Sequence, residues 1–314
     1  MIGYKTIIPS NLFFVTILIC ESLLTLTFVS LLEEMLDEIG GVEGFIILTD
    51  EDHMPETTLR NTLCYETLLA AETPDFTWPD LDERTASALC YTSGTTGNPK
   101  GVQYEHRSTL LHALAGLQPS TFNFTASSVM LPVVPMFHAA SWGLPFAGAM
   151  AGIKFVFSAV NEPAVLCDLM ERENVTDSAG VPTVWLATFQ YCDANDRPLP
   201  KLRAATIGGS AAPKFMIRRL MQAGIRVQHA WGMTETSPLG TVGGPTWDWD
   251  QLTLDQKVDK AAMQGRPVFG VELRTVDLDD PSKVLPRDGE ASGALQIRGP
   301  WVVKRYFKAE EDAI

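Results

Sequence analysis

The sequence predicts an α/β protein with a mostly parallel sheet flanked by helices and a smaller β-rich subdomain near its end. Short apolar runs alternate with segments of helical periodicity through the middle of the chain. A glycine-rich loop at residues 91–102 directly follows one predicted strand. The C-terminal part carries strand-like runs separated by turn-forming Asp, Pro and Gly. These three observations favour parallel strands joined by covering helices.

The composition excludes several classes of protein. Of the 314 residues, 46% are hydrophobic and 20% are charged, which is enough to bury a large core. The formal net charge of -14, without any cluster of Lys and Arg, argues against a nucleic-acid partner. The five cysteines are scattered and lack a Cys-x-x-Cys pair, which disfavours a disulfide framework and a zinc site. We therefore expect a reducing, cytoplasmic setting.

The N-terminal part contains a nearly unbroken apolar run at residues 12–32. The run is long enough to span a bilayer, but Glu21 interrupts it and its flanks are poor in basic residues. One interpretation is a membrane anchor or signal peptide, which would make the protein membrane-associated. The other is a buried strand and helix of a larger domain. We assign residues 1–23 to an apolar N-terminal segment and keep both interpretations.

The first elements after this segment alternate between helix and strand. The apolar spacing predicts a short amphipathic helix over 30–39, which Gly40 and Gly41 end before a strand at 44–48. Residues 73–82 suit a surface loop, because they are rich in Pro, Asp and aromatics. An apolar strand at 86–91 then leads into the glycine-rich loop.

The same alternation continues downstream. Residues 129–134 and 153–157 are typical of buried strands, while 163–173 and 213–223 have helical periodicity. Strand-like runs at 268–276 and 293–298 follow. We therefore divide the chain into an α/β core over 24–262 and a partial β-rich subdomain over 263–314.

The glycine-rich loop reads Tyr-Thr-Ser-Gly-Thr-Thr-Gly-Asn-Pro-Lys-Gly-Val from residue 91. Its hydroxyls and backbone N–H groups can surround one anion, its glycines allow a tight backbone, and its lysine neutralises charge. The Walker A pattern does not fit, because the glycine spacing differs and Gly101 stands where Ser or Thr is needed. The alternative is an ordinary polar turn. The candidate phosphate ligands are Thr92, Ser93, Gly94, Thr95, Thr96, Gly97 and Lys100.

This loop closely resembles the phosphate-binding signature of the adenylate-forming (AMP-binding) superfamily, which includes acyl-CoA ligases, peptide-synthetase adenylation domains and firefly luciferase. Residues 231–236, Trp-Gly-Met-Thr-Glu-Thr, are similar to the family segment whose aromatic residue lies against adenine. The resemblance implies that Trp231, Gly232, Met233 and Thr234 bind nucleotide. It also implies that Lys100, Thr234 and Glu235 serve catalysis.

A magnesium ion would accompany the nucleotide. Glu235 offers hard oxygen ligands, and by resemblance Thr92 shares the ion directly or through water. Without the family, a Thr-Glu pair is more typical of a helix cap or a solvated face.

Residues 208–213, Gly-Gly-Ser-Ala-Ala-Pro, resemble the glycine turn of the family beside AMP and the acyl carboxylate. The resemblance places Gly208 at the acid and Gly209 and Ser210 at the nucleotide. A strand-to-helix turn, with Ser210 as the cap and Pro213 in the first turn, is compatible with that role.

Residues 135–142, Pro-Met-Phe-His-Ala-Ala-Ser-Trp, resemble the acyl-pocket segment of medium- and long-chain fatty-acyl-CoA ligases. The resemblance implies that His138, Ala139 and Trp142 line the acyl pocket, with Trp142 where some relatives carry a tryptophan gate. Without the family, a structural histidine and a plain apolar core are the alternative.

The function implied by the resemblance is a fatty-acid–CoA ligase that uses ATP and Mg²⁺, with coenzyme A as co-substrate. An aryl or thioether acid, or a nucleotide- and acyl-binding remnant without turnover, are the alternatives. The resemblance begins near Leu24 and stops before the ribose-binding aspartate, hinge and mobile C-terminal domain of the family. We therefore expect a fragment truncated at both ends, of doubtful competence on its own. Membrane-surface association and a homodimer are further expectations.

Overall fold

The computed structural model describes residues 25–38, 42, 44–92, 99–158 and 160–309. The chain divides into two compact units. The first comprises residues 1–82 with 135–137, and the second comprises 83–134 with 138–314. This division differs from the boundaries predicted after residues 23 and 262. Each unit is described by itself.

The first unit contains a two-stranded parallel sheet and short helices. The side chains of Val29 and Leu32 pack against Phe45, Ile47 and Leu59, so one face of the first helix covers the sheet. The elements are α2 (Thr25–Glu34), β1 (Phe45–Ile47), η1 (Glu51–His53), β2 (Thr62–Cys64) and α3 (Tyr65–Ala70).

The first helix corrects the prediction for residues 30–39. It begins at Thr25 and ends at Glu34, and residues 35–38 form a turn. Leu31, inside the predicted helix, has an exposure of 47%, whereas Val29, which precedes the predicted start, is buried. Among the described residues, no helix is long and apolar enough to cross a membrane. Residues 12–24 of the apolar run lie outside the described residues.

The second unit is built on a seven-stranded sheet in the order β11-β10-β9-β8-β7-β5-β6. The pairs from β6 through β9 are parallel, and β10 and β11 are antiparallel additions at one edge. The predicted mostly parallel α/β fold is confirmed. The strands are β5 (Val129–Pro132), β6 (Lys154–Phe155), β7 (Asp177–Gly180), β8 (Ala204–Ile207), β9 (Arg226–Gly232), β10 (Leu239–Val242) and β11 (Arg266–Pro267).

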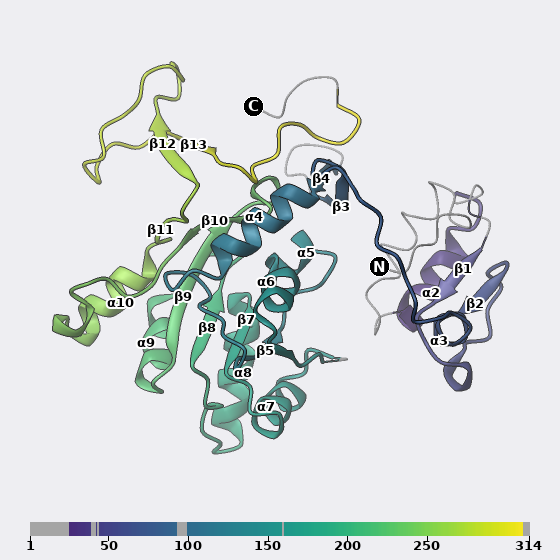
Figure 1. The fold of residues 1–314 in the computed structure, drawn as a ribbon. Coiled ribbons are helices and arrows are strands. Elements are labelled where there is room, and N and C mark those ends of the chain that lie inside the picture. The colour runs from purple at the N-terminus through teal and green to yellow at the C-terminus, as the bar shows by residue number, and fades with distance from the viewer. Residues whose placement is uncertain (1–24, 39–41, 43, 93–98, 159, 310–314) are drawn as a thin grey trace. The chain divides into compact units, whose positions relative to one another are not determined.

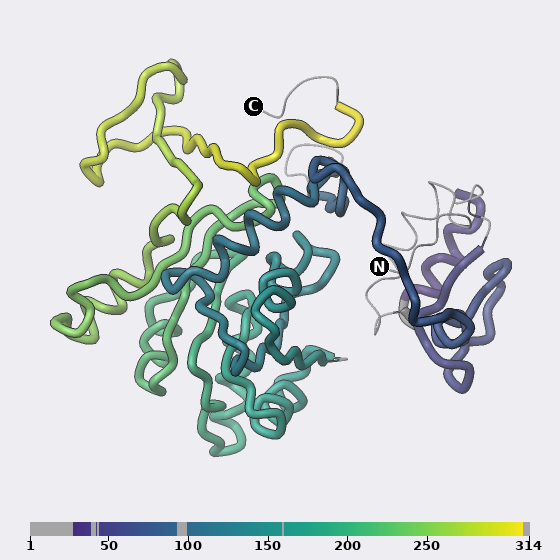
Figure 2. Tube along the Cα trace, in the orientation of Figure 1, coloured from purple at the N-terminus to yellow at the C-terminus, as the bar shows by residue number. Residues whose placement is uncertain are grey.

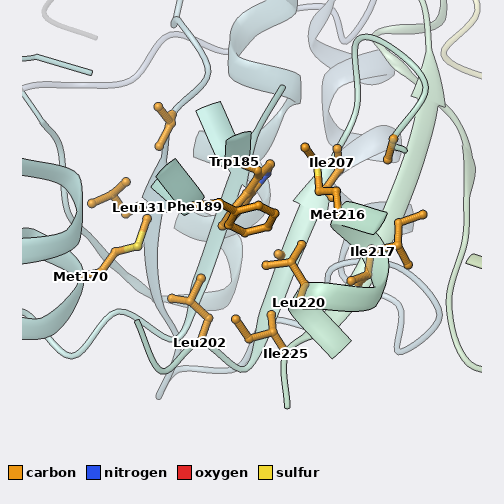
Figure 3. Packing of buried hydrophobic residues seen from close by; sticks show 14 of the residues in the cluster. Leu131, Met170, Trp185, Phe189, Leu202, Ile207, Met216, Ile217, Leu220 and Ile225 are labelled. Atoms are coloured by element: carbon orange, nitrogen blue, oxygen red, sulfur yellow. The ribbon is translucent and has the colours of Figure 1, made fainter. Parts of the chain in front are cut away.

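Helices cover both faces of this sheet (Figure 1). Successive strand residues point to opposite faces, so Leu131 joins the core beneath one helix layer, which Figure 3 shows, and Met130 joins the core beneath the other layer. Each such buried side chain contributes about 1.5–3 kcal/mol. One layer contains α7 (Pro163–Arg172), α8 (Pro182–Ala194), α9 (Lys214–Gln222) and α10 (Leu254–Ala262); the other contains α4 (His106–Gly116), α5 (Ala139–Trp142) and α6 (Leu144–Ala151).

Two antiparallel hairpins lie outside the main sheet. The hairpin that flanks the glycine-rich loop consists of β3 (Ala86–Tyr91) and β4 (Gly101–Glu105). The predicted strand at 86–91 is therefore present, but it pairs with β4 and not with the main parallel sheet. An apolar run alone does not specify its pairing partner.

The second hairpin consists of β12 (Glu272–Val276) and β13 (Ala294–Arg298), which the trace reaches after α10 (Figure 2). The strand predicted over 268–276 is shorter than expected. Gly270 has a φ of 97°, a left-handed conformation that turns the chain before β12. Val268 and Val271 are buried on either side of that turn.

Candidate active site

The carboxyl ends of β8 and β9 and the start of β10 surround one cavity of about 230 Å³. Loops at this edge of a parallel sheet are where ligands bind in open α/β folds. The cavity is lined by nine of the predicted site residues, namely His138, Ala139, Trp142, Gly208, Gly209, Trp231, Gly232, Met233 and Thr234. The structure therefore brings the predicted acyl-pocket residues and the predicted nucleotide residues to one place.

Trp142 reaches the cavity from an unusual left-handed turn. Residues 139–142 have φ values between 47° and 57°, a conformation that costs roughly 1–2 kcal/mol per residue. The turn is held from inside, because the buried Ser141 hydroxyl donates to the carbonyl of Val134 at 2.8 Å. The indole then lies against Gly208, where a Cβ would stand 3.1 Å from Trp142 Cη2. A glycine at 208 thus leaves room for the ring in the cavity wall.

A buried histidine supports the same wall. The amide of Leu239 donates to His112 Nε2 at 3.2 Å, and the ring of His112 meets Trp301 edge to face at 5.9 Å. Burial lowers the pKa of His112 to about 4, so the ring is neutral at physiological pH. His112 could not be proposed from the sequence, because it belongs to no recognisable motif and its buried place in α4 follows from the tertiary fold.

Trp231 presents a half-buried aromatic ring at the end of β9. The ring packs against Gly240, where a Cβ would lie 2.7 Å from Trp231 Cζ3. Gly232 is equally constrained, since a Cβ there would stand 1.8 Å from the carbonyl oxygen of Pro238. The glycines therefore let the β9–β10 turn close tightly and leave an aromatic surface along the cavity.

Glu235 lies in a short 3-10 helix, η2 (Thr234–Thr236), with Met233 as its N-cap. The hydroxyl of Tyr306 donates to Glu235 Oε1 at 2.7 Å, and this hydrogen bond, with partial burial, raises the pKa of Tyr306 to about 12. The hydroxyl of Tyr104 donates to the carbonyl of Thr234 at 2.8 Å. Burial raises the pKa of Tyr104 well above its ordinary value. Both phenols thus remain protonated donors, Tyr306 to the Glu235 carboxylate and Tyr104 to the backbone carbonyl of Thr234.

The described ends of the glycine-rich loop are joined by two hydrogen bonds. The amide of Thr92 donates to the carbonyl of Lys100 at 2.9 Å, and the amide of Lys100 donates to Thr92 Oγ1 at 3.3 Å. Lys100 Nζ lies 4.8 Å from the ring centroid of Tyr306. Lys100 and Glu235 therefore contact the same tyrosine. The predicted phosphate ligands Ser93, Gly94, Thr95, Thr96 and Gly97 lie outside the described residues.

The predicted metal ligands fit an ion that a nucleotide carries. Glu235 is half-buried and forms no ion pair with a basic side chain in the described part of the chain. Within that part, no group of three or more His, Cys, Asp or Glu side chains could hold a metal alone. Mg²⁺ is commonly held by one or two carboxylates together with substrate phosphates. Glu235, with the Thr92 hydroxyl, matches that donor set.

Ser210 departs from the predicted arrangement. Its side chain is exposed and does not line the cavity. The cap interpretation is also wrong, since α9 begins at Lys214 with Pro213 as its N-cap in an extended conformation. Proline supplies the fixed φ at this helix start, so no serine cap is needed.

Several further residues of the site were missed from the sequence, among them Phe122, Thr206 and Tyr306. Phe122 and Thr206 line the cavity, and Tyr306 contacts Glu235 from the far end of the chain. Thr206 precedes the glycine turn by two residues and could have been proposed from that proximity. Phe122 and Tyr306 reach the site only through the tertiary fold, and no local pattern marks them.

The family of the chain follows from a sequence comparison. The family model described as AMP-binding enzyme matches residues 17–307. The chain belongs to the AMP-binding enzyme family. This confirms the resemblance drawn from the glycine-rich loop and from residues 231–236.

Named relatives of this AMP-binding chain are acid–CoA ligases. It is 41% identical over 286 residues to the medium-chain-fatty-acid–CoA ligase of Ectopseudomonas oleovorans, covering 90% of this chain and 52% of that protein. It is 40% identical over 290 residues to the 3-methylmercaptopropionyl-CoA ligase of Ruegeria pomeroyi, covering 92% and 53%. The chain thus spans about half the length of the curated relatives it matches.

A solved structure supports the fold. The long-chain-fatty-acid-CoA ligase of Archaeoglobus fulgidus superposes with a TM-score of 0.71 at 22% identity, covering 89% of this chain and 57% of that one. The AMP-binding chain therefore has the α/β fold seen in that ligase.

Proposed function

We propose that this chain is the nucleotide- and acid-binding core of a fatty-acid–CoA ligase. The observation that carries the proposal is the cavity in which Trp142 and Gly208 meet Trp231 and Thr234. That arrangement supports a carboxylic acid and a nucleotide bound next to each other. The names of the relatives favour the same activity.

The proposed reaction needs no nucleophile from the enzyme. The substrate carboxylate oxygen attacks the α-phosphorus of ATP, the bond to the β-phosphate oxygen breaks, and pyrophosphate leaves. The coenzyme A thiol, losing its proton, then attacks the acyl carbonyl, and AMP leaves. The protein therefore contributes by holding the reacting groups in line and by stabilising negative charge.

Different described residues would bind the phosphates, the metal ion, the adenine and the acid. Lys100 supplies positive charge for the ATP phosphates. Glu235 and Thr92 would hold Mg²⁺, which when bound spreads the negative charge of the phosphates. Trp231 offers its flat ring to the adenine, and the open backbone of Gly208 and Gly209 allows the reacting carboxylate to approach closely.

The cavity wall favours an apolar acid. The indole of Trp142, the ring of Phe122 and the side chains of Ala139 and Leu239 line it. No Asp or Glu occurs among the described residues that line it, so an amino-acid ammonium would be left unpaired. A thioether acid, as named for one relative, would satisfy the same wall and is the second candidate substrate.

The test is acid-dependent pyrophosphate release with MgATP by this chain joined to the mobile C-terminal domain of the family, measured with decanoate and, as the matched control, with leucine. We expect release with decanoate and none with leucine or without acid. Equal release in all three mixtures would contradict acid activation. Nucleotide binding without any release would favour the binding remnant.

We further propose that the protein works in a reducing compartment such as the cytoplasm. Cys64, Cys90, Cys167 and Cys192 are buried free thiols, which supports that proposal. Membrane-surface association and a homodimer stay predictions.

A further inference from the structure

We infer that Tyr306 is a positioning residue that orients the Glu235 carboxylate and the Lys100 ammonium to bind magnesium-bound ATP. The inference rests on the proposed function, because it assigns roles to the side chains of the same site. Tyr306 contacts both a predicted metal ligand and a predicted phosphate ligand, which come from separate motifs.

The backbone around Tyr306 is fixed to both motifs. Tyr306 forms an antiparallel bridge with Val102 in β4, and the amide of Phe307 donates to the carbonyl of Gly101 at 2.7 Å. On the other side, the amide of Val303 donates to the carbonyl of Glu235 at 2.9 Å. The segment that carries Tyr306 thus joins the strand after the glycine-rich loop to η2.

The phenol hydroxyl then selects one oxygen of Glu235. It donates to Oε1 at 2.7 Å. No other described side chain donates to the Glu235 carboxylate, so Oε2 remains for a metal ion. Hydrogen bonds to a ligating carboxylate orient it, and loss of such a partner typically lowers metal affinity roughly 10–100-fold.

The phenol ring of Tyr306 contacts the ammonium group of Lys100. Lys100 Nζ stands 4.8 Å from the ring centroid, within the range of a cation–π interaction. Lys100 is exposed and forms no ion pair with an acidic side chain in the described ranges. The ring therefore restrains an exposed ammonium beside the loop without neutralising it, so the charge stays available to phosphate.

Two substitutions separate the contacts. Tyr306→Phe removes the hydroxyl and keeps the ring, and Tyr306→Leu removes both. Tyr104→Phe is the matched control, because it also deletes a phenol hydrogen bond to η2 but one that ends on the backbone carbonyl of Thr234. Circular dichroism would confirm that each variant is folded.

The measurement is ATP binding by calorimetry over a series of Mg²⁺ concentrations. Tyr306→Phe is expected to raise the half-saturating Mg²⁺ concentration about tenfold, with little change in ATP affinity at saturating Mg²⁺. Tyr306→Leu should weaken binding at saturating Mg²⁺ by a further factor of about two to five. Tyr104→Phe should leave the Mg²⁺ dependence unchanged.

The outcomes separate the inference from the proposed function. An unchanged or lower Mg²⁺ requirement in Tyr306→Phe, with MgATP still bound by the unaltered protein, would overturn the positioning role alone. An equal shift in Tyr104→Phe would also overturn it, because the effect would then be a general loosening of η2. Absence of MgATP binding by the unaltered protein would overturn the proposed function and the inference with it.

Discussion

Substituting Gly143 by alanine tests the packing beneath the cavity wall. Gly143 directly follows Trp142 and has a φ of 72°, and a Cβ there would lie 2.5 Å from His112 Cε1 and 2.6 Å from Nδ1. The left-handed conformation costs alanine about 1–2 kcal/mol. Displacing His112 also leaves the buried amide of Leu239 unpaired, which costs about 1–3 kcal/mol. We therefore expect the free energy of unfolding to fall by about 2–5 kcal/mol.

The chain offers a matched control in Gly152. Its φ is 65°, but a Cβ there would meet nothing within 4 Å. Gly152→Ala should therefore cost only the backbone strain of about 1–2 kcal/mol. Equilibrium urea unfolding followed by circular dichroism compares the two variants. Equal losses of stability would refute the reasoning, because they would show that His112 does not restrict residue 143.

Three more predictions follow from single contacts. Trp231→Ala should weaken ATP binding about tenfold by calorimetry, since base–aromatic stacking contributes about 1–3 kcal/mol, whereas Trp231→Phe should retain most of the affinity. The contribution of His112 to the free energy of unfolding should fall by about 3 kcal/mol between pH 6.5 and pH 4. The unfolded chain binds a proton at His112 below pH 6.5, whereas the folded protein does so only near a pKa of about 4. In urea titrations, His112→Gln should remove that part of the pH dependence. Arg203→Ala should lower the free energy of unfolding in urea by about 2–3 kcal/mol, because the buried Asp177 loses the guanidinium that lies 2.7 Å away. Lys214→Ala, which breaks an exposed ion pair with Asp259, should lower it by less than about 1 kcal/mol.

Each of these predictions has a result that contradicts it. Equal ATP affinity in Trp231→Ala and the unaltered protein would exclude stacking on that ring. A pH dependence that is unchanged in His112→Gln would assign it to other groups. Equal costs for Arg203→Ala and Lys214→Ala would show that burial of the aspartate adds nothing to the ion pair.

Two elements with clear boundary signals could be predicted closely from the sequence. The predicted helix at 163–173 is α7 (Pro163–Arg172), and the predicted strand at 293–298 is β13 (Ala294–Arg298). Their ends were predicted closely because Pro163 begins the helix and Gly293 and Gly299 flank the strand. The strand at 86–91 was also located, but its antiparallel partner was not, because pairing depends on how the intervening loop reverses.

The site was predictable where its residues sit together at a strand end. Gly208 and Trp231 belong to local motifs that resemble those of the family, and this resemblance predicted them to lie at the ligands. The left-handed turn at 139–142 has no such signal, because Ala and Ser do not favour that conformation and packing imposes it. Tyr306 likewise depends on a contact made only in the folded chain.

The most direct test of a working nucleotide core is calorimetric titration of this chain with ATP, with and without Mg²⁺. The comparison is with the double variant Lys100→Ala, Glu235→Ala and with a charge-matched control, Lys214→Ala, Asp259→Ala, which removes an exposed ion pair outside the cavity. We predict Mg²⁺-dependent binding that weakens at least about tenfold in the first variant and is unchanged in the control. Absence of binding by the unaltered chain, or equal binding by both variants, would contradict the account.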